Sequence, residues 1–418
     1  MIKLVHEDPE FGEFGIFDSQ TGTLYFDELK YKQLAARPGM KHFEPIGSPS
    51  NTHTIFPRRI YFQITRRCNL SCPYCFIRAN ESELDLPSNV LFNLIDYLKN
   101  TALMEVRLTG GEPTLHKDFI ESSERFREGG IYVSVATNGV WRSDVFDYFC
   151  NTDDMFLIVS VDGDREHHNA CRRNSYDIIV DNLNRLRKVN KNVRIRLNTV
   201  LTIDTMTCIE SVFLLAARIN AESITFIPLR PQVRDLNIRN RMLNAFQFRE
   251  AIEKMIELRH RYDVDFTTTI ETDFKDEILS DKIFRKQSSC AAGREGTNLD
   301  YDISRNEFLL YGCSYCPASD PDVSPQIRAP FLAGKIPFDR PELIDSVWNN
   351  ENQWQIYRNL SFKSDDCGKC AYYRSRCTGS CPIQNINFEE LRLDTDVLSQ
   401  LKEQMRRNGE WYCYKRLK

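Results

Sequence analysis

The sequence predicts an α/β fold in which six strand–helix units form an open, TIM-like partial barrel, (β/α)6. Between about residues 57 and 230, short runs rich in β-branched and aromatic residues alternate with longer segments that have helical apolar spacing. This alternation is typical of parallel strands joined by right-handed helical crossovers. A closed barrel of this kind needs eight units, so six units form only part of one. The predicted strands lie at 59–65, 104–109, 131–136, 156–161, 193–200 and 223–228.

The helices between these strands are indicated by apolar spacing and by residues that start or stop helices. Residues 88–100 have helical spacing behind Ser88, whose hydroxyl can cap the first turn. A helix over 119–128 stops at two glycines. Further helices are predicted over 143–150 and 176–189, and one more is expected between the last two strands.

Charge and hydropathy narrow the class of partner. The 418 residues include 55 Lys and Arg and 59 Asp and Glu, giving a net charge of −4, and the short basic runs are broken by acids and amides. The N-terminal residues have no apolar segment typical of a secretion signal, and no apolar run approaches the roughly 18 residues that span a membrane. We therefore expect a cytoplasmic protein with no nucleic-acid partner and no membrane partner.

Three cysteines follow the first predicted strand with the spacing C-x3-C-x2-C: Cys68, Cys72 and Cys75. Three thiolates on one short loop can hold three irons of a [4Fe–4S] cluster and leave the fourth iron open. A zinc site would need a fourth Cys or His nearby, and three cysteines cannot pair evenly in disulfides. This arrangement, with Tyr74 before the third cysteine, resembles the radical SAM superfamily. The resemblance implies a [4Fe–4S] cluster on these cysteines and S-adenosyl-L-methionine (SAM) as a second cofactor, with Tyr74 near it.

A glycine-rich segment ends the second predicted strand, at the end where such barrels carry their chemistry. Gly110 and Gly111 allow the backbone to approach a ligand closely, and Glu112 adds an acceptor. An ordinary Gly-rich turn is the alternative for this run taken alone. In the radical SAM family the segment resembles the one that binds the methionyl amino group of SAM.

The end of the fourth strand carries a second pair of candidate SAM contacts. Ser160 is followed twelve residues later by Arg172, and the pair looks like the family's serine and arginine that contact the ribose and carboxylate of SAM. An arginine fork suits a carboxylate. Arg173 is a rival for the same role. The turn at Thr137-Asn138-Gly139 either faces the same cavity or is a plain turn.

A second set of cysteines lies in the last third of the chain. A structural zinc site is one alternative, but it needs four ligands and would account for only four of these cysteines. The set resembles the SPASM domain, whose seven-cysteine pattern ends radical SAM enzymes and holds two auxiliary [4Fe–4S] clusters. Two departures from that pattern are the six residues between Cys370 and Cys377, where five are usual, and Phe308, where a glycine is usual.

The resemblance implies a ligand set for each auxiliary cluster. The fourth ligand of the inner cluster has two alternatives: Cys316 supplies it, or that iron has no protein ligand and is open to substrate. Cys150, Cys171 and Cys208 lie on or beside helical segments, and we expect them to be small apolar residues. The inner cluster would use Cys290, Cys313, Cys316 and Cys381, and the outer one Cys367, Cys370, Cys377 and Cys413.

We divide the chain into an N-terminal strand-rich element at 1–56, the radical SAM barrel at 57–285 and the SPASM domain at 286–418. Within the first element, apolar arms around Gln20-Thr21-Gly22 suggest a hairpin, and 31–36 suggests a short helix. Peptide-modifying radical SAM enzymes often begin with such an element, which captures a precursor peptide as an added strand. The alternative is a strand pair that covers the open edge of the barrel.

The resemblance to radical SAM/SPASM peptide maturases implies an oxidoreductase that acts on a ribosomally made precursor peptide. It would form a thioether or carbon–carbon cross-link, using three [4Fe–4S] clusters, SAM and a flavodoxin- or ferredoxin-type reductant. One alternative is an anaerobic sulfatase-maturing enzyme, which makes formylglycine. Others are an iron–sulfur electron-transfer protein without SAM chemistry and a zinc-binding interaction module. The sequence identifies no catalytic residue beyond these sites.

Overall fold

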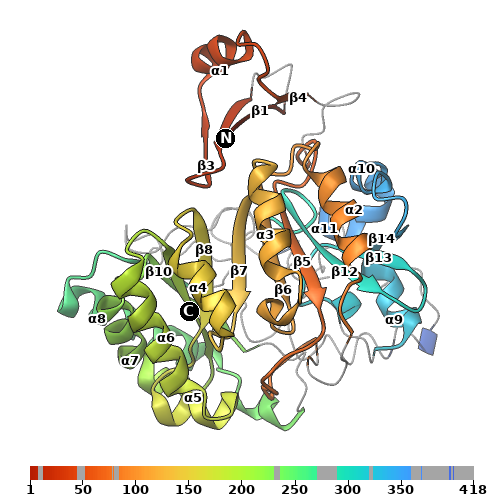
Figure 1. Cartoon of the computed structure of the whole chain (residues 1–418). Coiled ribbons are helices and arrows are strands. Elements are labelled where there is room, and N and C mark those ends of the chain that lie inside the picture. The colour runs from red at the N-terminus through yellow and green to blue at the C-terminus, as the bar shows by residue number, and fades with distance from the viewer. Residues whose placement is uncertain are drawn as a thin grey trace.

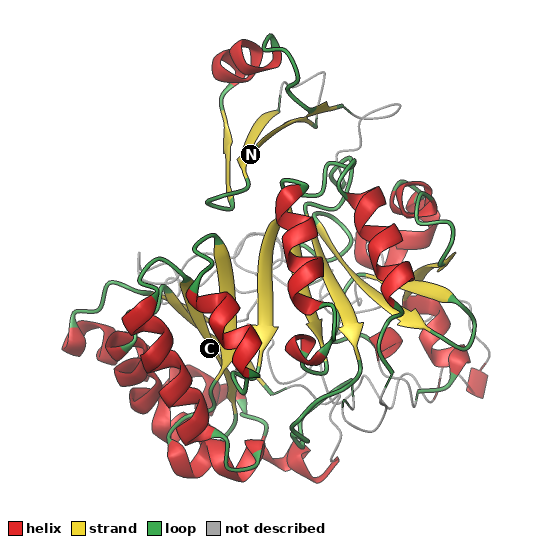
Figure 2. Ribbon diagram, viewed as in Figure 1, coloured by secondary structure: helices red, strands yellow, loops and turns green. Residues whose placement is uncertain are grey.

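The computed structural model describes residues 1–7, 13–44, 52–77, 84–229, 236–270, 290–319 and 323–358, with a few isolated positions outside these ranges. Within them, Figures 1 and 2 show a large sheet whose helices line one side of its strands, and a smaller sheet at one end. In the part of the chain described, no helix is both long and apolar enough to cross a membrane.

The six predicted strands all form, and they lie side by side in sequence order as parallel neighbours. An additional parallel strand, β11 (Thr267–Ile270), pairs with the last of them and was not predicted. The arrangement is a mixed α/β fold consistent with a partial barrel. The six strands are β5 (Arg59–Thr65), β6 (Glu105–Gly110), β7 (Tyr132–Thr137), β8 (Met155–Ser160), β9 (Arg194–Leu201) and β10 (Ser223–Pro228).

The helices predicted between the six strands form close to their predicted positions, and two further helices, α5 (Arg165–Arg172) and α8 (Ala245–Tyr262), were not predicted. Helix α5 lies between β8 and the next helix. The strands are buried because helices cover them; the run Met155–Val159 in β8 is wholly buried. The other helices are α2 (Ser88–Leu98), α3 (Phe119–Glu128), α4 (Ser143–Cys150), α6 (Tyr176–Val189), α7 (Ile209–Arg218) and α8 (Ala245–Tyr262), with 3-10 turns at η1 (Pro113–Leu115), η2 (Thr205–Cys208) and η3 (Leu236–Arg241).

The C-terminal segment extends the same sheet. Strand β12 (Gly296–Asp302) pairs in parallel with β5, and β13 (Glu307–Tyr311) and β14 (Leu332–Pro337) follow as antiparallel neighbours. The sheet therefore continues across the proposed boundary at residue 285. The remaining elements of this segment are η4 (Pro317–Ser319), α9 (Pro325–Arg328), η5 (Ala329–Phe331), α10 (Leu343–Trp348), η6 (Glu351–Trp354) and α11 (Gln355–Arg358).

The first residues form a separate four-stranded sheet of order β3-β2-β1-β4. The predicted hairpin is β2 and β3, and the predicted short helix corresponds to α1. The bounds are β1 (Ile2–His6), β2 (Phe14–Asp18), β3 (Thr23–Phe26), α1 (Glu28–Ala35) and β4 (His42–Phe43).

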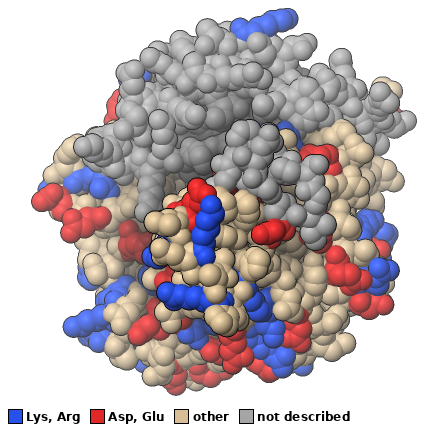
Figure 3. All heavy atoms as spheres, turned by 90° about the horizontal axis from the view of Figure 1, so that it is seen from above, with Lys and Arg blue, Asp and Glu red and all other residues tan. Residues whose placement is uncertain are grey.

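The small sheet contacts the ends at which the barrel strands begin. The buried Lys3 ammonium donates to the carbonyl of Leu103, just before β6, at 2.7 Å. Arg194, the first residue of β9, donates to the carbonyl of Thr21 at 2.7 Å. The small sheet therefore lies across the strand beginnings (Figure 1) rather than along an edge of the large sheet. In Figure 3, which looks onto this end, basic and acidic residues are interspersed over the described surface.

Candidate functional site

A cavity of about 230 Å³ lies where the barrel strands end. The loop after β5 forms one side, and the terminal residues of β6, β7, β8, β9 and β10 form the others. Most of the residues predicted to bind the cluster and SAM line it, although they are far apart in the sequence. These lining residues are Cys68, Cys72, Tyr74, Cys75, Gly110, Gly111, Ser160 and Arg172.

The cysteine loop is tied at its base. The backbone N–H of Arg66 donates to the carbonyl of Leu84 at 2.9 Å, which brings the two ends of the loop together. Asp85 accepts hydrogen bonds from the hydroxyl of Thr65 at 2.5 Å and from the guanidinium of Arg67 at 3.0 Å. The short cysteine spacing also turns the chain locally, because the N–H of Cys75 donates to the carbonyl of Cys72 at 3.1 Å. The three thiols are therefore presented by a closed loop.

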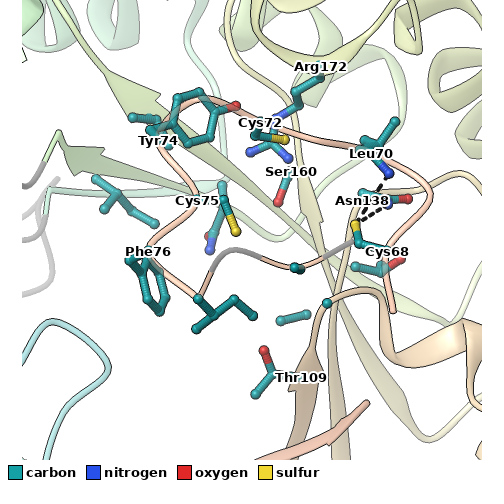
Figure 4. A pocket seen from close by; sticks show the side chains of 18 of the residues that line it. Cys68, Leu70, Cys72, Tyr74, Cys75, Phe76, Thr109, Asn138, Ser160 and Arg172 are labelled. Atoms are coloured by element: carbon teal, nitrogen blue, oxygen red, sulfur yellow. Dashed lines mark hydrogen bonds between the residues drawn. The ribbon is translucent and has the colours of Figure 1, made fainter. Parts of the chain in front are cut away.

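The donor set fits a cluster better than a single ion. Figure 4 shows the three sulfurs placed around the cavity. Among the described residues, the three thiols do not all lie within 4.8 Å of one another, whereas the four ligands of one zinc ion crowd closer than that. Burial raises the pKa of Cys68 to about 12, so a bound metal would be needed to hold it as a thiolate.

The two glycines at the end of β6 are required by the cysteine loop itself. A Cβ on Gly110 would collide with the carbonyl oxygen of Thr65, and one on Gly111 with that of Arg67. Gly110 also has φ +141°, which L side chains rarely adopt. The N–H of Gly111 donates to the Thr65 carbonyl at 2.8 Å. The close approach that we predicted toward a ligand is thus also an approach of β6 to the base of the loop.

Glu112 lies behind the cavity wall and does not line it. Its carboxylate is fully buried and accepts hydrogen bonds from the Thr114 hydroxyl at 2.7 Å, the Thr137 hydroxyl at 2.8 Å and the Asn138 N–H at 2.6 Å. Burial raises the pKa of Glu112. The side chain of Asn138 in turn donates to Asn69 at 2.6 Å and approaches the sulfur of Cys68 at 3.9 Å. Glu112 therefore acts here on the turn after β7, which lines the cavity.

Arg172, rather than Arg173, faces the cavity. Arg172 ends α5 and is 8% exposed, and its Nε donates to the carboxylate of Asp162 at 2.6 Å. Arg173 is exposed, has φ +49° and does not line the cavity. The phenol of Tyr74 donates to the same Asp162, and its ring lies 5.3 Å from the guanidinium of Arg172. Burial alone would raise the pKa of Asp162, but Arg172 and neighbouring donors hold it below its ordinary value.

Several lining residues were not identified from the sequence. Asn198 and Val200 come from the end of β9, and 227–229 from the end of β10. Their positions at strand ends could have indicated them, since we expected the chemistry there. Tyr315 comes from the C-terminal segment and packs its ring on that of Phe76, with centroids 5.7 Å apart. No local pattern in the sequence links these two aromatic residues.

Three of the predicted auxiliary-cluster cysteines are described. Cys313 and Cys316 share one turn, in which the N–H of Cys316 donates to the Cys313 carbonyl at 3.2 Å. Cys316 is fully buried, burial raises its pKa to about 11, and the phenol of Tyr357 donates to its sulfur at 3.4 Å. Cys290 is partly buried. The predicted ligands outside the described residues are Cys367, Cys370, Cys377, Cys381 and Cys413.

The three cysteines expected to be ordinary small residues lie outside the cavity. Cys208 is buried, and Cys150 and Cys171 are partly buried. The sulfur of Cys208 lies within 4.8 Å of ligand atoms of Asp164 and His167. The Asp164 carboxylate there caps α5 by accepting from the His167 N–H at 3.0 Å.

Residues 62–216 match the family model described as the radical SAM superfamily. Among curated proteins, the chain is 31% identical over 160 residues to an S-adenosylmethionine-dependent nucleotide dehydratase of Selenomonas ruminantium, covering 34% of this chain and 56% of that protein. It is 32% identical over 158 residues to a GTP 3',8-cyclase of Haemophilus influenzae, covering 35% of this chain and 46% of that protein. The chain thus matches about half the length of these relatives.

Solved structures are similar over most of the chain. Streptococcus suis SuiB bound to the precursor peptide SuiA has a TM-score of 0.64 at 13% identity, with 88% of this chain and 91% of that chain covered. The structure of anSMEcpe with bound AdoMet and the Cp18Cys peptide has a TM-score of 0.59 at 21% identity, with 86% and 98% covered. At these identities the similarity shows the fold alone.

Proposed function

We propose that this chain, whose residues 62–216 belong to the radical SAM superfamily, is a radical SAM oxidoreductase that modifies a ribosomally made precursor peptide. The observation that carries the proposal is the similarity of fold, over 86–88% of the chain, to two proteins whose structures contain bound peptides. The bond we expect is a thioether or carbon–carbon cross-link: the radical would remove one hydrogen atom, and the second electron would pass to an auxiliary iron–sulfur cluster as a proton leaves. The family itself implies a [4Fe–4S] cluster and SAM.

The cavity residues suit this chemistry. Cys68, Cys72 and Cys75 would hold the cluster, while Ser160 and Arg172 would contact SAM. When bound, the reduced cluster and SAM supply a one-electron cleavage of SAM, which yields a radical that abstracts a hydrogen atom from carbon. The chain's own part is to hold the cofactors and substrate in register and to exclude water.

The cavity wall is well suited to excluding water. Apolar and aromatic side chains make up much of its lining, among them Phe76, Ile77, Leu229 and Tyr315. Tyr315 comes from the C-terminal segment, so that segment helps to close the site. We propose that 286–418 is a SPASM domain with two auxiliary clusters, that 57–285 is the catalytic barrel, and that 1–56 is an accessory sheet. A flavodoxin- or ferredoxin-type protein would supply the electron.

A sulfatase-maturing activity is the second candidate. It is favoured by the similarity to anSMEcpe, of which 98% is covered. The two candidates differ in their product, because formylglycine carries an aldehyde and a cross-linked peptide does not.

The experiment uses anaerobically reconstituted protein with dithionite and SAM. The substrate is a short Cys- or aromatic-rich peptide, to be sought among the products of the neighbouring genes. We expect 5′-deoxyadenosine and a peptide lighter by two hydrogens that does not react with a hydrazide. A Cys72→Ala variant should release no 5′-deoxyadenosine, and it serves as the control. A hydrazide-reactive product would favour the second candidate, and a colourless protein that releases no 5′-deoxyadenosine would refute both.

A further inference from the structure

One buried carboxylate joins three sides of the cavity without lining it. Asp162 is fully buried, two residues beyond the end of β8. It accepts hydrogen bonds from the phenol of Tyr74, from Nε of Arg172 at 2.6 Å and from the backbone N–H of Val200 at 2.7 Å. These donors belong to the cysteine loop, to α5 and to β9, and each of the three residues lines the cavity. Asp162 is therefore a shared anchor for separate parts of the wall.

The contact with Asp162 fixes how the guanidinium of Arg172 is presented. Because Nε is donated to the carboxylate, the plane of the guanidinium is set, and a ligand can be met only by the terminal nitrogens. Figure 4 shows these nitrogens beside Cys72 and Ser160. A long arginine side chain without such an anchor would sample many rotamers, and ordering it would cost binding free energy.

A chain of hydrogen bonds also links the backbone of Asp162, just after β8, to the backbone carbonyl of Arg172. The N–H of Asp162 donates to Nδ1 of His168 at 3.1 Å, so the ring proton of His168 is on Nε2. Nε2 can then donate to the Ser175 hydroxyl at 3.0 Å, and that hydroxyl donates to the carbonyl of Arg172 at 2.7 Å. His168 is fully buried, and this is the one direction in which all three hydrogen bonds are satisfied together.

We propose that Asp162 is a positioning residue that holds Arg172 and the cysteine loop in the arrangement that binds SAM, without touching SAM itself. This inference rests on the proposed function, because it takes SAM as the ligand. The proposal also predicts the direction in which SAM affinity changes when the charge of Asp162 is removed. The negative charge of Asp162 repels a ligand carboxylate, so a purely electrostatic role would make SAM bind more tightly once that charge is removed. A positioning role makes SAM bind more weakly.

The test is the dissociation constant of SAM for the reconstituted holoenzyme, measured anaerobically by calorimetry. Asp162→Asn keeps the size of the side chain and can still accept from Val200, but it loses its charged pair with Arg172. Glu105→Gln is the matched control, since it breaks a partly buried pair with Arg59 and Arg107 at the end of β6 far from the cavity. We expect Asp162→Asn to weaken SAM binding at least tenfold, and Glu105→Gln to leave it within twofold.

Two further readouts separate positioning from general damage. The iron content of Asp162→Asn should match that of the wild type, and the change that SAM causes in the EPR spectrum of the reduced cluster should need about tenfold more SAM. If Asp162→Asn does not fold, Asp162→Glu replaces it, because it keeps the charge and moves the acceptor by one methylene. Weaker binding in that variant supports positioning.

The failures of the two proposals are distinguishable. Unchanged or tighter SAM binding in the Asp162 variants, with a wild type that binds SAM normally, overturns the positioning role alone. A wild type that holds iron but binds no SAM overturns the proposed function.

Discussion

Removing the carboxylate of Asp300 should destabilise the chain and weaken the base of the cysteine loop. Asp300 lies on β12 and is fully buried. Its carboxylate accepts from Gln63 at 2.6 Å, from Arg66 at 2.9 Å and from the N–H of Tyr301 at 2.8 Å. Asp300→Ala leaves the largely buried Arg66 as an unpaired charge, which costs about 3–5 kcal/mol. Asp300→Asn keeps one acceptor, so we expect about half that loss.

The assay is urea unfolding followed by tryptophan fluorescence, with iron measured in parallel. Because Arg66 begins the cysteine loop, Asp300→Ala should also retain less iron at the cluster site of Cys68, Cys72 and Cys75. The double variant Arg66→Met with Asp300→Leu removes both charges, and it should recover much of the lost stability. The reasoning would be refuted if Asp300→Ala stayed within about 1 kcal/mol of the wild type. It would also fail if the double variant were less stable than Asp300→Ala.

Three further predictions concern the cluster and pH. Changing Cys68, Cys72 and Cys75 together to Ala should remove about four irons per chain by colorimetric assay, and an unchanged iron content would contradict the ligand assignment. Burial lowers the pKa of His168 to about 4, so the unfolded chain gains its proton first. Stability should therefore fall as the pH drops from about 6.5 toward 4, and His168→Gln should lessen that fall in urea titrations. Burial also lowers the pKa of Lys3 to about 7, so the stability of the wild type relative to Lys3→Met should rise between pH 7 and about 10.5. A pH-independent difference would refute this.

Local sequence signals were sufficient for most of the barrel. The helices at 119–128, 143–150 and 176–189 begin and end where they were predicted, because their apolar spacing and flanking residues are strong. Helix α5 was missed because its sequence, Arg-Glu-His-His-Asn-Ala-Cys-Arg, has no apolar stripe; its buried residues are His168 and Arg172. Its burial comes from polar contacts at the site, which apolar periodicity cannot detect.

The site shows the same limit. The motifs indicated which residues gather at the strand ends, but not which of them line the cavity and which hold its wall in place. The sequence suggested that Glu112 faces a ligand, whereas its carboxylate is occupied by the turn after β7. No pattern in the sequence singled out Asp162. The pairing of β12 with β5 joins segments more than two hundred residues apart, and such contacts leave no local pattern.

The pairing of β12 with β5 also has a consequence for any attempt to shorten the chain. Strand β12 pairs with Arg59–Phe62 and satisfies backbone N–H and C=O groups on one side of that part of β5. Ending the chain near residue 285 would expose that side of Arg59–Phe62, in a strand of mostly apolar and aromatic residues. An uncovered edge of this kind is a template for pairing with other chains. We therefore expect the barrel expressed alone to aggregate, and engineering of the barrel should retain the β12–β14 segment.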